Sequence, residues 1–390
     1  MPNNWKKYKL GEIAGFSYGK MPKKELLAKG IYPTYSGYKY QYKYPQFNCD
    51  KNDIIIVARG VGGTGDVKIV KEKCYLTNLS IKIELDKNIV DFQYFYFQYF
   101  LNTLRYLDSG SAQSQITIND LNRLELKLPP LQEQQSIASI LSAIDDKIEN
   151  NLAINKTLEE MAMALYKHWF VDFGPFQDGE FVESELGMIP EGWEVKKITE
   201  LIEVKDGTHD SPKRVDKGCF LITSKHMIGN IIDFSTAYKI SQDDFTKINK
   251  RSLVEKGDIL MTMIGTVGNF HFVNEEPNYV IKNIGLFKTS KLPKIQSYLY
   301  SYFKSKIGQE YIKAQMTGST QQYVTLNTLR NFDIIVPNEE TLNEFNQITN
   351  DYFETIMNRT KENQTLTQLR DTLLPQLISG AVRLKEFREY

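Results

Sequence analysis

Short apolar runs bounded by turn residues recur along the chain, and two of them are closely similar. The runs KNDIIIVARG and KGDILMTMIG each place an apolar stretch between an aspartate and a glycine, which is typical of a buried strand. Residues 91–107 and 295–316 instead place aromatic side chains at helical spacing, and Gly110 and Gly318 fit as helix stops after them. The pattern predicts mixed domains that contain both helices and strands.

Two longer segments are helical in pattern. No glycine or proline occurs from Gln132 to about Phe170, and apolar residues recur there at alternating spacings of four and three. This is the heptad-like pattern of a coiled coil. A weaker version of the same stripe follows residue 338. A helix of this length, about 38 residues, would span roughly 57 Å at 1.5 Å per residue.

Both stripes are polar in the middle, at Asn151 and Asn155 in the first and at Arg359 and Asn363 in the second. A helix that is apolar on one face needs a partner, and the other long helix is the natural one. An antiparallel pair would place two globular domains at opposite ends around a pseudo-two-fold axis. It would also set Asn151 near Asn363 and Asn155 near Arg359, as a polar layer that fixes the helix register. The alternative is that each helix packs separately on its own domain.

The chain contains an internal repeat. In both copies the order is a tryptophan, an Asp-Ile strand with glycines, an Asn-Leu or Asn-Ile pair, an aromatic segment, a Gly-Ser-x-Gln loop and a proline before the long helix. The members of the two copies are Trp5 and Trp193, Asp53 and Asp258, Asn78 and Asn283, Tyr94 and Tyr298, Gly110 and Gly318, and Pro129 and Pro337. The second copy holds 17 extra residues between its tryptophan and its Asp-Ile element. This predicts one shared scaffold that carries two different surfaces.

The fold class that follows is α+β, with two repeated globular domains and two long antiparallel helices. The boundaries we predict are a first domain at 1–130, a long helix at 131–174, a linker at 175–190, a second domain at 191–337, and a second long helix with a C-terminal tail at 338–390. Each domain is long enough to bury a core of its own.

Composition narrows the classes of function. Lys+Arg and Asp+Glu are both 48, so a uniformly basic nucleic-acid coat is excluded. The net charge is nevertheless blockwise: +7 over 1–130, −6 over 131–180, +2 over 181–337 and −3 over 338–390. The 3 cysteines, the absence of a signal-peptide pattern at the start and the lack of an apolar run near 20 residues predict a cytoplasmic protein without a membrane contact.

Several candidate catalytic or cofactor motifs fail on inspection. Gly60-x-Gly62-x2-Gly65 formally matches a dinucleotide fingerprint, but a second strand pattern follows it where a helix is needed. Asp53, with Asp66 and Lys68, loosely resembles a nuclease metal set, although Asp53 is better explained as a turn residue before a strand. His209, Cys219 and His226 match no standard metal spacing. We therefore expect no catalytic residues and no metal in this chain.

Polar, donor-rich segments in each domain are candidates for contact with nucleic acid. The run YSGYKYQYKY predicts a strand with tyrosines on one face and Lys39, Gln41 and Lys43 on the other. Lysine neutralises phosphate, and glutamine hydrogen-bonds base edges. A solvated strand over a tyrosine-lined core is an equally good explanation, and helix capping explains the Gly-Ser-x-Gln loops slightly better than binding does. The full candidate set is Lys20, Lys23, Lys24, Lys39, Gln41, Lys43, Arg59, Gln113, Thr208, His209, Lys213, Arg214, Ser224, Lys225 and Gln321.

Five segments together carry a family resemblance: LPPLQEQQSIASILSAIDDKIENN, LEEMAMALYKHWFVDF, DGTHDSP, ITSKHM and LRDTLLPQLISGAVRL. With the repeat, they make the chain resemble the DNA specificity subunit of type I restriction-modification systems. The resemblance implies that each globular domain is a target recognition domain that reads one half of a split double-stranded DNA sequence. It does not identify the contact residues, because the DNA-reading loops of such subunits differ widely.

The same resemblance implies the partners. Two methyltransferase subunits would dock on the helices and carry S-adenosylmethionine, so this chain would need no cofactor of its own. Restriction and motor subunits would join them for cleavage, although the sequence does not exclude a system that only methylates. The competing interpretation is a coiled-coil scaffold with two protein-binding domains, which would explain the repeat and the helices as well.

Overall fold

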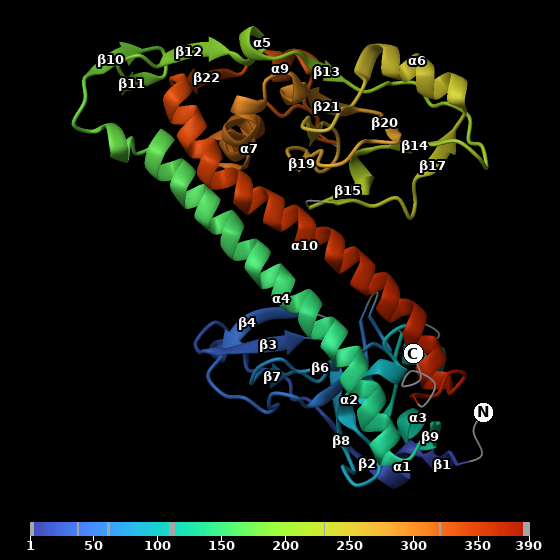
Figure 1. Ribbon diagram of the computed structural model, residues 1–390. Coiled ribbons are helices and arrows are strands. Elements are labelled where there is room, and N and C mark those ends of the chain that lie inside the picture. The colour runs from blue at the N-terminus through green and yellow to red at the C-terminus, as the bar shows by residue number, and fades with distance from the viewer. Residues whose placement is uncertain are drawn as a thin grey trace. The chain divides into compact units, whose positions relative to one another are not determined.

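The computed structural model (Figure 1) describes residues 4–36, 39–60, 63–108, 114–229, 231–319 and 321–384, without the side chains of Ser36 and of residues 39–41. The chain forms two compact units. Unit 1 combines Met1–Glu149 with Gln364–Tyr390, and unit 2 is Asn150–Asn363. Two long helices, α4 (Leu131–Phe170) and α10 (Glu339–Ser379), each begin in one unit and end in the other.

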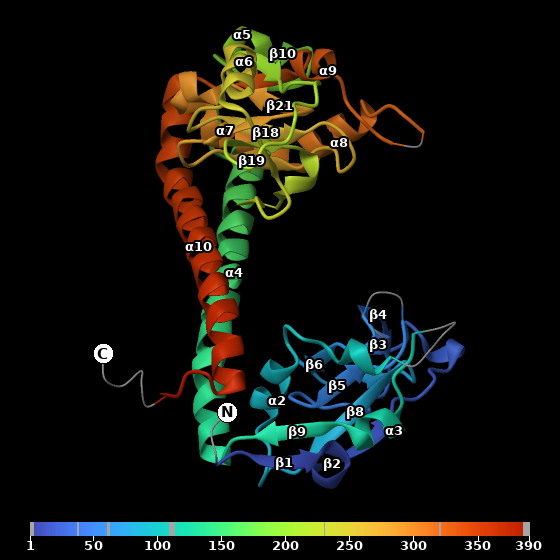
Figure 2. The same ribbon diagram turned by 90° about the vertical axis from the view of Figure 1, so that its right-hand side faces the viewer.

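Unit 1 is built on small sheets (Figure 2). A four-stranded antiparallel sheet has the order β2–β8–β5–β6, formed by Ala14–Tyr18, Ser80–Leu85, Ile54–Val57 and Val67–Ile69. A three-stranded sheet has the order β4–β3–β7, formed by Lys39–Tyr44, Tyr32–Ser36 and Tyr75–Leu76, in which β3 and β7 are parallel. The remaining elements are β1 (Lys6–Lys9) paired with β9 (Glu125–Leu128), α1 (Leu10–Ile13), α2 (Phe92–Gln98) and α3 (Ile118–Arg123), with 3-10 turns η1 (Lys24–Leu26) and η2 (Leu104–Leu107).

Unit 2 repeats this topology. Its four-stranded sheet, β13–β21–β18–β19, is formed by Val204–Asp206, Ile284–Phe287, Ile259–Thr262 and Phe270–Phe272. Its three-stranded sheet, β17–β14–β20, is formed by Tyr238–Ile240, Cys219–Ile222 and Tyr279–Ile281, again with one parallel pair, β14 and β20. The β1–β9 pair has its counterpart in β12 (Glu194–Lys197) and β22 (Asp333–Val336), and α1 and α3 correspond to α5 (Ile198–Leu201) and α9 (Leu326–Arg330).

The two units differ where the sequence repeat has its extra residues. Unit 2 inserts the strand pair β15 (Met227–Ile228) and β16 (Ile231–Ile232) before β17, and helix α6 (Gln242–Ser252) between β17 and β18. The region predicted as a linker contains the turn η3 (Gly174–Phe176) and a hairpin of β10 (Phe181–Ser184) and β11 (Gly187–Pro190). The repeat and the α+β class are confirmed, and the insertion forms new elements rather than extending old ones.

The aromatic segments are shorter helices than their spacing predicts. In unit 1, α2 ends at Gln98, and Thr103 starts the separate turn η2 by accepting a hydrogen bond from Arg105 N. In unit 2, α7 (Gln296–Lys304) and α8 (Lys306–Ala314) are separated at Ser305, whose hydroxyl accepts from Gly308 N at 3.1 Å. The expectation of one long helix in each segment is wrong because a hydroxyl side chain caps a new helix inside it. Gly318 lies beyond the end of α8, and Gly110 lies outside the described residues.

The ends of α4 and α10 complete the core of each unit. In unit 1, Ile137 and Leu141 of α4 and Leu374 and Leu377 of α10 belong to the cluster that surrounds β5 and α2. In unit 2, Tyr166 and Phe170 of α4 meet Phe345 of α10, with ring centroids 6.4 Å and 4.9 Å apart. Each unit therefore buries one end of both helices.

Hydrogen bonds establish the direction and register of the helix pair, which Figures 1 and 2 show side by side. In unit 1, Arg383 donates to Glu133 (3.0 Å) and Arg370 to Asp145 (2.8 Å). In unit 2, Asn151 donates to Asn363 (2.8 Å). As the residue number rises along α4, the number of its partner falls along α10 and the residues just after it, so the helices are antiparallel, as the stripes predict.

The structure brings together the four polar residues at the middle of the stripes. Asn151 Nδ2 donates to Asn363 Oδ1, and Arg359 donates to Asn151 Oδ1 at 2.9 Å. Asn155 forms no hydrogen bond with Arg359 among the described residues, and donates instead to Thr360 Oγ1 (3.2 Å) and to the Ile356 carbonyl (3.3 Å). The three asparagines are buried and Arg359 is half-buried, so the layer is enclosed by the helix pair instead of facing solvent.

A buried ion pair supports the central strand of unit 2. The Asp258 carboxylate is fully buried and accepts from Lys288 Nζ at 2.5 Å and from Glu255 N at 2.7 Å. Lys288 also donates to Glu255 Oε2 (2.8 Å), and hydrogen bonds from Lys288 and Lys291 hold the pKa of Glu255 below its usual value. Two charged side chains can be buried together without a large loss of stability only when hydrogen bonds satisfy both of them, as they do here.

Unit 1 keeps the same turn at Asp53, the counterpart of Asp258. Its carboxylate accepts from Asp50 N at 2.7 Å and from Lys82 Nζ at 2.8 Å. Asp53 is thus a turn residue before a strand, in line with the structural explanation given above for this residue. Asp66 pairs with Lys68 at 3.3 Å and is not part of a metal set with Asp53 among the described residues.

We predict that replacing Asn151, Asn155, Arg359 and Asn363 together with leucine leaves the chain folded but permits register slips, because nothing polar then distinguishes one apolar alignment from another. Spin labels on the exposed residues Thr157 and Glu354 of unit 2 measure the register by their distance distribution. The parent should give one narrow peak and the leucine variant several. Asn150→Leu with Asn358→Leu adds apolar residues outside the layer and should keep one peak; a single peak in both variants would contradict the prediction.

We also predict that Lys288→Ala lowers the free energy of unfolding by about 3 kcal/mol, because it leaves a buried carboxylate unpaired. Lys291→Ala removes an exposed lysine that contacts the same Glu255 and should change it by less than about 0.5 kcal/mol. Urea unfolding followed by tryptophan fluorescence measures both. Equal decreases in the free energy of unfolding for the two variants would contradict the prediction, because burial of the Asp258–Lys288 pair would then not determine its contribution to stability.

Candidate nucleic-acid interface

The predicted lysines of unit 1 lie on one loop and on the strand beside it. The loop at 20–29 is held against β4 by hydrogen bonds from Ala28 N to the Lys43 carbonyl (2.8 Å) and from Lys23 N to Tyr44 Oη (3.2 Å). Lys20, Lys23, Lys24 and Lys43 are all exposed. The structure therefore places Lys23, Lys24 and Lys43 on or beside the outer strand β4. Lys20 lies at the opposite edge of the three-stranded sheet, where its N–H donates to the Leu76 carbonyl of β7.

The predicted tyrosine face of β4 is only partly buried. Tyr44 is 2% exposed and packs on Tyr75 with ring centroids 4.0 Å apart, whereas Tyr42, two positions earlier on the same face, is 53% exposed. The expectation of a continuous tyrosine-lined core under β4 is wrong at Tyr42. This residue lies on an edge strand, at the irregularity in the pairing of β4 with β3. The side chains of Lys39 and Gln41 lie outside what the structure describes.

Each unit places the turn after its central strand beside the segment that follows its Gly-Ser-x-Gln motif. In unit 1, the exposed Arg59 forms a β-bridge with Gln115, and Ile116 N donates to the Ala58 carbonyl at 2.9 Å. In unit 2, the equivalent bridge joins Ile264 to Tyr323, and Gly265 N donates to the Gln322 carbonyl at 3.1 Å. Two distant segments thus form one loop surface in each unit.

One of the two predicted glutamines, Gln321, belongs to this loop surface. Gln321 is exposed beside the Ile264–Tyr323 bridge, and Gln113 lies outside the described residues. The threonines that follow cap helices: Thr117 accepts from Asp120 N at 3.3 Å and Thr325 from Thr328 N at 3.1 Å. Capping therefore accounts for the threonines and leaves Gln321 available to solvent.

In unit 2, the DGTHDSP loop is organised by a carboxylate that the sequence did not single out. Asp206, at the end of β13, is buried and accepts from His209 Nε2 at 3.0 Å and from the guanidinium of Arg251 on α6. His209 Nδ1 also lies 2.7 Å from Asn283 Oδ1. The loop and α6 are thereby tied to one acceptor.

The remaining candidates of this loop divide into inward and outward residues. Thr208 is buried, and its hydroxyl accepts from Asp210 N at 3.1 Å, so it shapes the turn and does not face outward as a free donor. Ser211 accepts from Lys282, which fixes the loop against the turn between β20 and β21. Lys213 and Arg214 follow Pro212 and are exposed.

Only one of the two candidates in the turn η4 (Ser224–His226) faces solvent. Lys225 is exposed, whereas Ser224 Oγ is buried and has no hydrogen-bond partner in the described part of the chain. Burial, with a smaller contribution from Lys225, lowers the pKa of His226, whose Nδ1 lies 2.9 Å from Thr223 N. His226 is therefore neutral at pH 7, and Lys225 supplies the positive charge of this turn.

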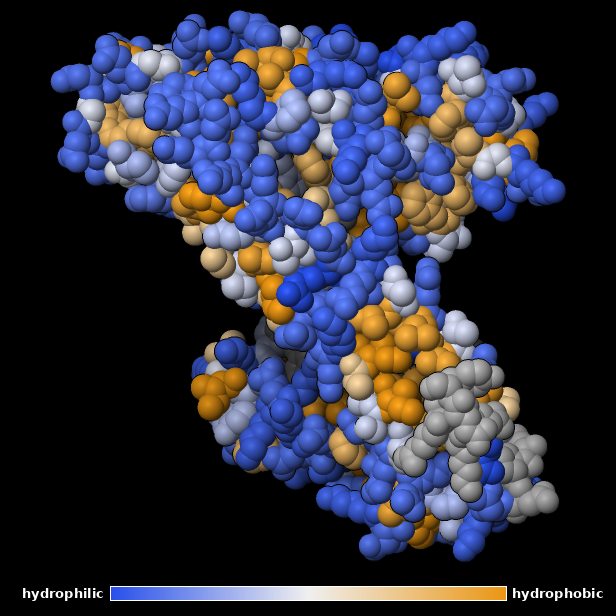
Figure 3. Space-filling view, in the orientation of Figure 1, coloured by the Kyte–Doolittle hydropathy of each residue, from blue (hydrophilic) through white to orange (hydrophobic). Residues whose placement is uncertain are grey.

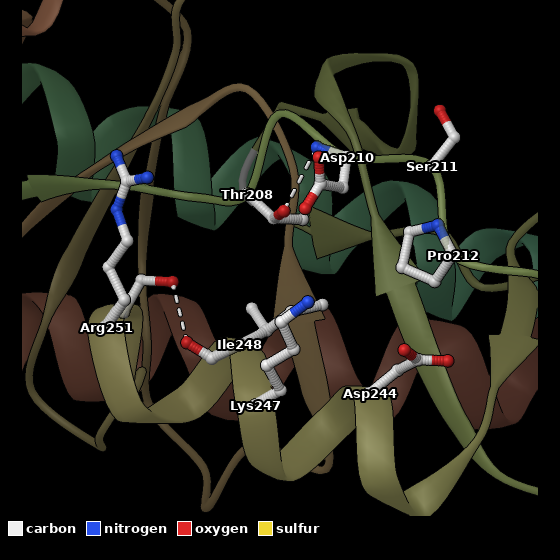
Figure 4. Close-up of a pocket in the computed structure, with 9 residues that line it drawn as sticks. Thr208, Asp210, Ser211, Pro212, Asp244, Lys247, Ile248 and Arg251 are labelled. Carbon is white, nitrogen blue, oxygen red and sulfur yellow. Dashed lines mark hydrogen bonds between the residues drawn. The ribbon is translucent and has the colours of Figure 1, made fainter.

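A pocket of about 330 Å³ lies between the DGTHDSP loop and α6 (Figure 4). Residues 208 and 210–212 line one side, and α6 lines the other with side chains that include Lys247 and Arg251. Sequence reasoning missed both basic residues. The available signal was Ser241 followed by Asp244, a helix N-cap pattern that the structure confirms with a 3.1 Å bond from Asp244 N to Ser241 Oγ.

The cofactor and metal motifs have structural explanations. Strand β6 follows the glycines of unit 1, where a dinucleotide site would need a helix. Gly65 packs so closely against the turn η2 that a Cβ at this position would lie 2.3 Å from Arg105 N. His209, Cys219 and His226 each have a separate partner in Asp206, Gln242 and Thr223. Within the described ranges, no group of three or more His, Cys, Asp and Glu side chains is arranged to hold a metal.

The hydrophilic surface of unit 2 is suited to polar contacts with a ligand. The face of unit 2 visible in Figure 3 is largely hydrophilic, with hydrophobic residues in small groups. No helix among the described residues is both long and apolar enough to cross a bilayer.

Comparison with known proteins places this geometry in a family. Residues 2–160 and 190–369 match the family model described as the type I restriction modification DNA specificity domain. Among similar proteins is the type I restriction enzyme MjaIX specificity subunit of Methanocaldococcus jannaschii, 27% identical over 351 residues, which cover 86% of this chain and 79% of the relative. The MjaVIII specificity subunit of the same organism is 23% identical over 412 residues, which cover 99% and 94%.

A solved structure shares the fold. The crystal structure of a type I restriction-modification S subunit from M. genitalium aligns with a TM-score of 0.65 and covers 97% of both chains at 20% sequence identity. At that identity, the likeness concerns the arrangement of the elements and not the residues that contact a ligand.

Proposed function

The chain belongs to the type I restriction-modification DNA specificity family, and from that premise we propose that it is the subunit that selects the DNA sequence for such a complex. Each unit reads one half of a bipartite double-stranded site, and the helix pair sets the distance between the halves. The observation that carries the proposal is the repeat of one sheet topology in two units that share two continuous helices.

The helix pair suits this role physically. Reading two segments of duplex one helical turn apart requires readers held about 34–36 Å apart. Hydrogen bonds in both units lock the register of α4 and α10, whereas a flexible linker would allow the separation to vary. A fixed helix register therefore supports a fixed spacer in the recognised sequence.

The outward faces of the helices fit protein partners better than DNA. Their acidic character repels phosphate, and large apolar side chains are exposed on them, namely Ile140, Leu152 and Met161 on α4 and Ile348 and Leu369 on α10. We propose that two methyltransferase subunits dock there, with restriction and motor subunits joining for cleavage. The chemistry belongs to those partners, which would also carry S-adenosylmethionine, and the complex would act in the cytoplasm.

The competing function is a scaffold whose two domains bind proteins. Binding of the reconstituted complex to duplex DNA separates the two proposals. A specificity subunit requires both half-sites and gives an affinity that falls steeply with salt, because cations released from phosphate drive binding. A scaffold gives neither result.

We predict that four extra residues in each long helix, inserted after Lys147 in α4 and after Thr367 in α10, lengthen the DNA spacer and leave both half-sites unchanged. One helical turn adds roughly 6 Å, under two base pairs at about 3.4 Å each. Methylome sequencing of cells that express the variant with its methyltransferase reports both the halves and the spacer. The length-neutral control Lys147→Ala with Thr367→Ala should keep the original spacer, and altered half-sites in the insertion variant would refute the prediction.

A further inference from the structure

Helix α6 is the main element by which unit 2 departs from unit 1. In unit 1 the chain passes from β4 to β5 through residues 45–53, which form no helix, whereas in unit 2 the passage from β17 to β18 contains α6. Of the two insertions into the shared scaffold, α6 and the β15–β16 pair, α6 is the longer. Because each unit reads its own half-site under the proposed function, α6 is the place to look for contacts of unit 2 alone.

The pocket beside α6 contains basic side chains whose donors are not all used by hydrogen bonds or ion pairs within the described part of the protein. Lys247 extends from α6 toward the loop that carries Thr208 and Asp210 (Figure 4), and its ammonium has no ion pair or hydrogen bond among the described residues. Arg251, one turn further along α6, uses one nitrogen to contact Asp206, and its side chain remains 56% exposed. Its other donors are therefore free to meet an acceptor from outside.

Asp206 determines where Arg251 and His209 lie. Its side chain is 4% exposed, and it joins a helix residue and a loop residue that are far apart in sequence. A buried carboxylate that accepts from two exposed donor groups holds them in one orientation without being able to reach a ligand itself. This makes Asp206 a positioning residue for the two donors.

The carboxylates around the pocket restrict where an anion can be seated. Asp244 accepts from Ser241 Oγ at 2.7 Å, in the cap of α6. Asp210 lies on the loop side and is exposed. Asp244 lies on α6 itself, three residues before Lys247, so a phosphate is repelled by both carboxylates and attracted to Lys247 and Arg251.

We propose that α6 is part of the DNA interface of unit 2, with one backbone phosphate of duplex DNA seated on Lys247 and Arg251 and with Asp206 as the positioning residue. This inference rests on the proposed function, because it requires duplex DNA as the ligand. It adds a backbone contact from an inserted helix to the loops identified from sequence. Phosphate contacts of this kind fix the placement of a protein on DNA without reading its sequence.

The test uses the reconstituted complex with its methyltransferase subunits and duplexes that carry either the recognised site or an unrelated sequence. Lys247→Ala should weaken binding to both duplexes by a similar factor, about tenfold. It should also reduce the slope of log affinity against log salt by about 0.9, the value for one lost phosphate contact. Lys250→Ala is the matched control: this lysine is exposed on α6 but does not line the pocket, and its slope should stay that of the parent.

Phosphate ethylation interference locates the contact. The interference pattern is the set of phosphates whose ethylation blocks binding of the parent complex. In Lys247→Ala, one phosphate beside the half-site read by unit 2 should drop out of this set, and every phosphate beside the other half-site should remain in it. In an Arg251→Ala background, Asp206→Asn should change the salt slope no further, because Asp206 acts on phosphate through Arg251. If Asp206 had a purely structural role, Asp206→Asn would lower the affinity for DNA whether or not Arg251 is present.

The outcomes separate this inference from the proposed function. If Lys247→Ala and Lys250→Ala behave alike, or if the interference pattern is unchanged, α6 does not seat a phosphate even though the complex binds DNA. If the parent complex shows no salt-dependent binding to duplex DNA, the proposed function itself fails.

Discussion

The rest of the structure depends on the mutual burial of two helices whose apolar stripes have polar centres. Neither α4 nor α10 can bury its apolar stripe alone. Each helix contributes one of its ends to the core of unit 1 and the other end to the core of unit 2. Apolar side chains alone would allow several alignments that differ by a heptad. The hydrogen bonds of Asn151 with Asn363 and Arg359 are satisfied in one alignment, and a shift would leave buried amides without partners. The register is therefore defined by polar groups inside an apolar contact.

Duplication of one sheet topology lets the same chain carry two surfaces. The order of strands is the same in the two units, so the backbone that supports the loops is the same as well. The differences lie in elements added between equivalent strands, above all α6 and the β15–β16 pair. Such insertions change the side chains that a unit presents without altering the register of its central sheet. This arrangement suits a protein that must present two different recognition surfaces with one geometry.

Local patterns predicted those parts of the fold that depend on neighbouring residues. The uninterrupted stripe of α4 and the Asp-Ile strands were readable because their periodicity and turn residues are local, and the alignment of the two stripes then gave the meeting of Asn151 with Asn363. The breaks at Thr103 and Ser305 were missed, because a single hydroxyl cap interrupts an otherwise helical aromatic pattern. The contact of Asp206 with Arg251 could not be read from sequence. It depends on how an inserted helix packs against a loop, for which neither residue carries a periodic signal.

The two buried carboxylates of unit 2 show how the exposure of the partner cation distinguishes a structural pair from a functional one. Asp258 and Asp206 both lie inside the protein and both accept from a basic side chain. The partner of Asp258, Lys288, is itself buried and has its donors occupied by Asp258, Glu255 and a backbone carbonyl, so the pair ends within the fold. The partner of Asp206, Arg251, is anchored at one nitrogen, and more than half of its side chain is exposed. A pair of the first kind contributes to stability, whereas a pair of the second kind orients a cation toward solvent, where the phosphates of a duplex supply the acceptors that the protein lacks.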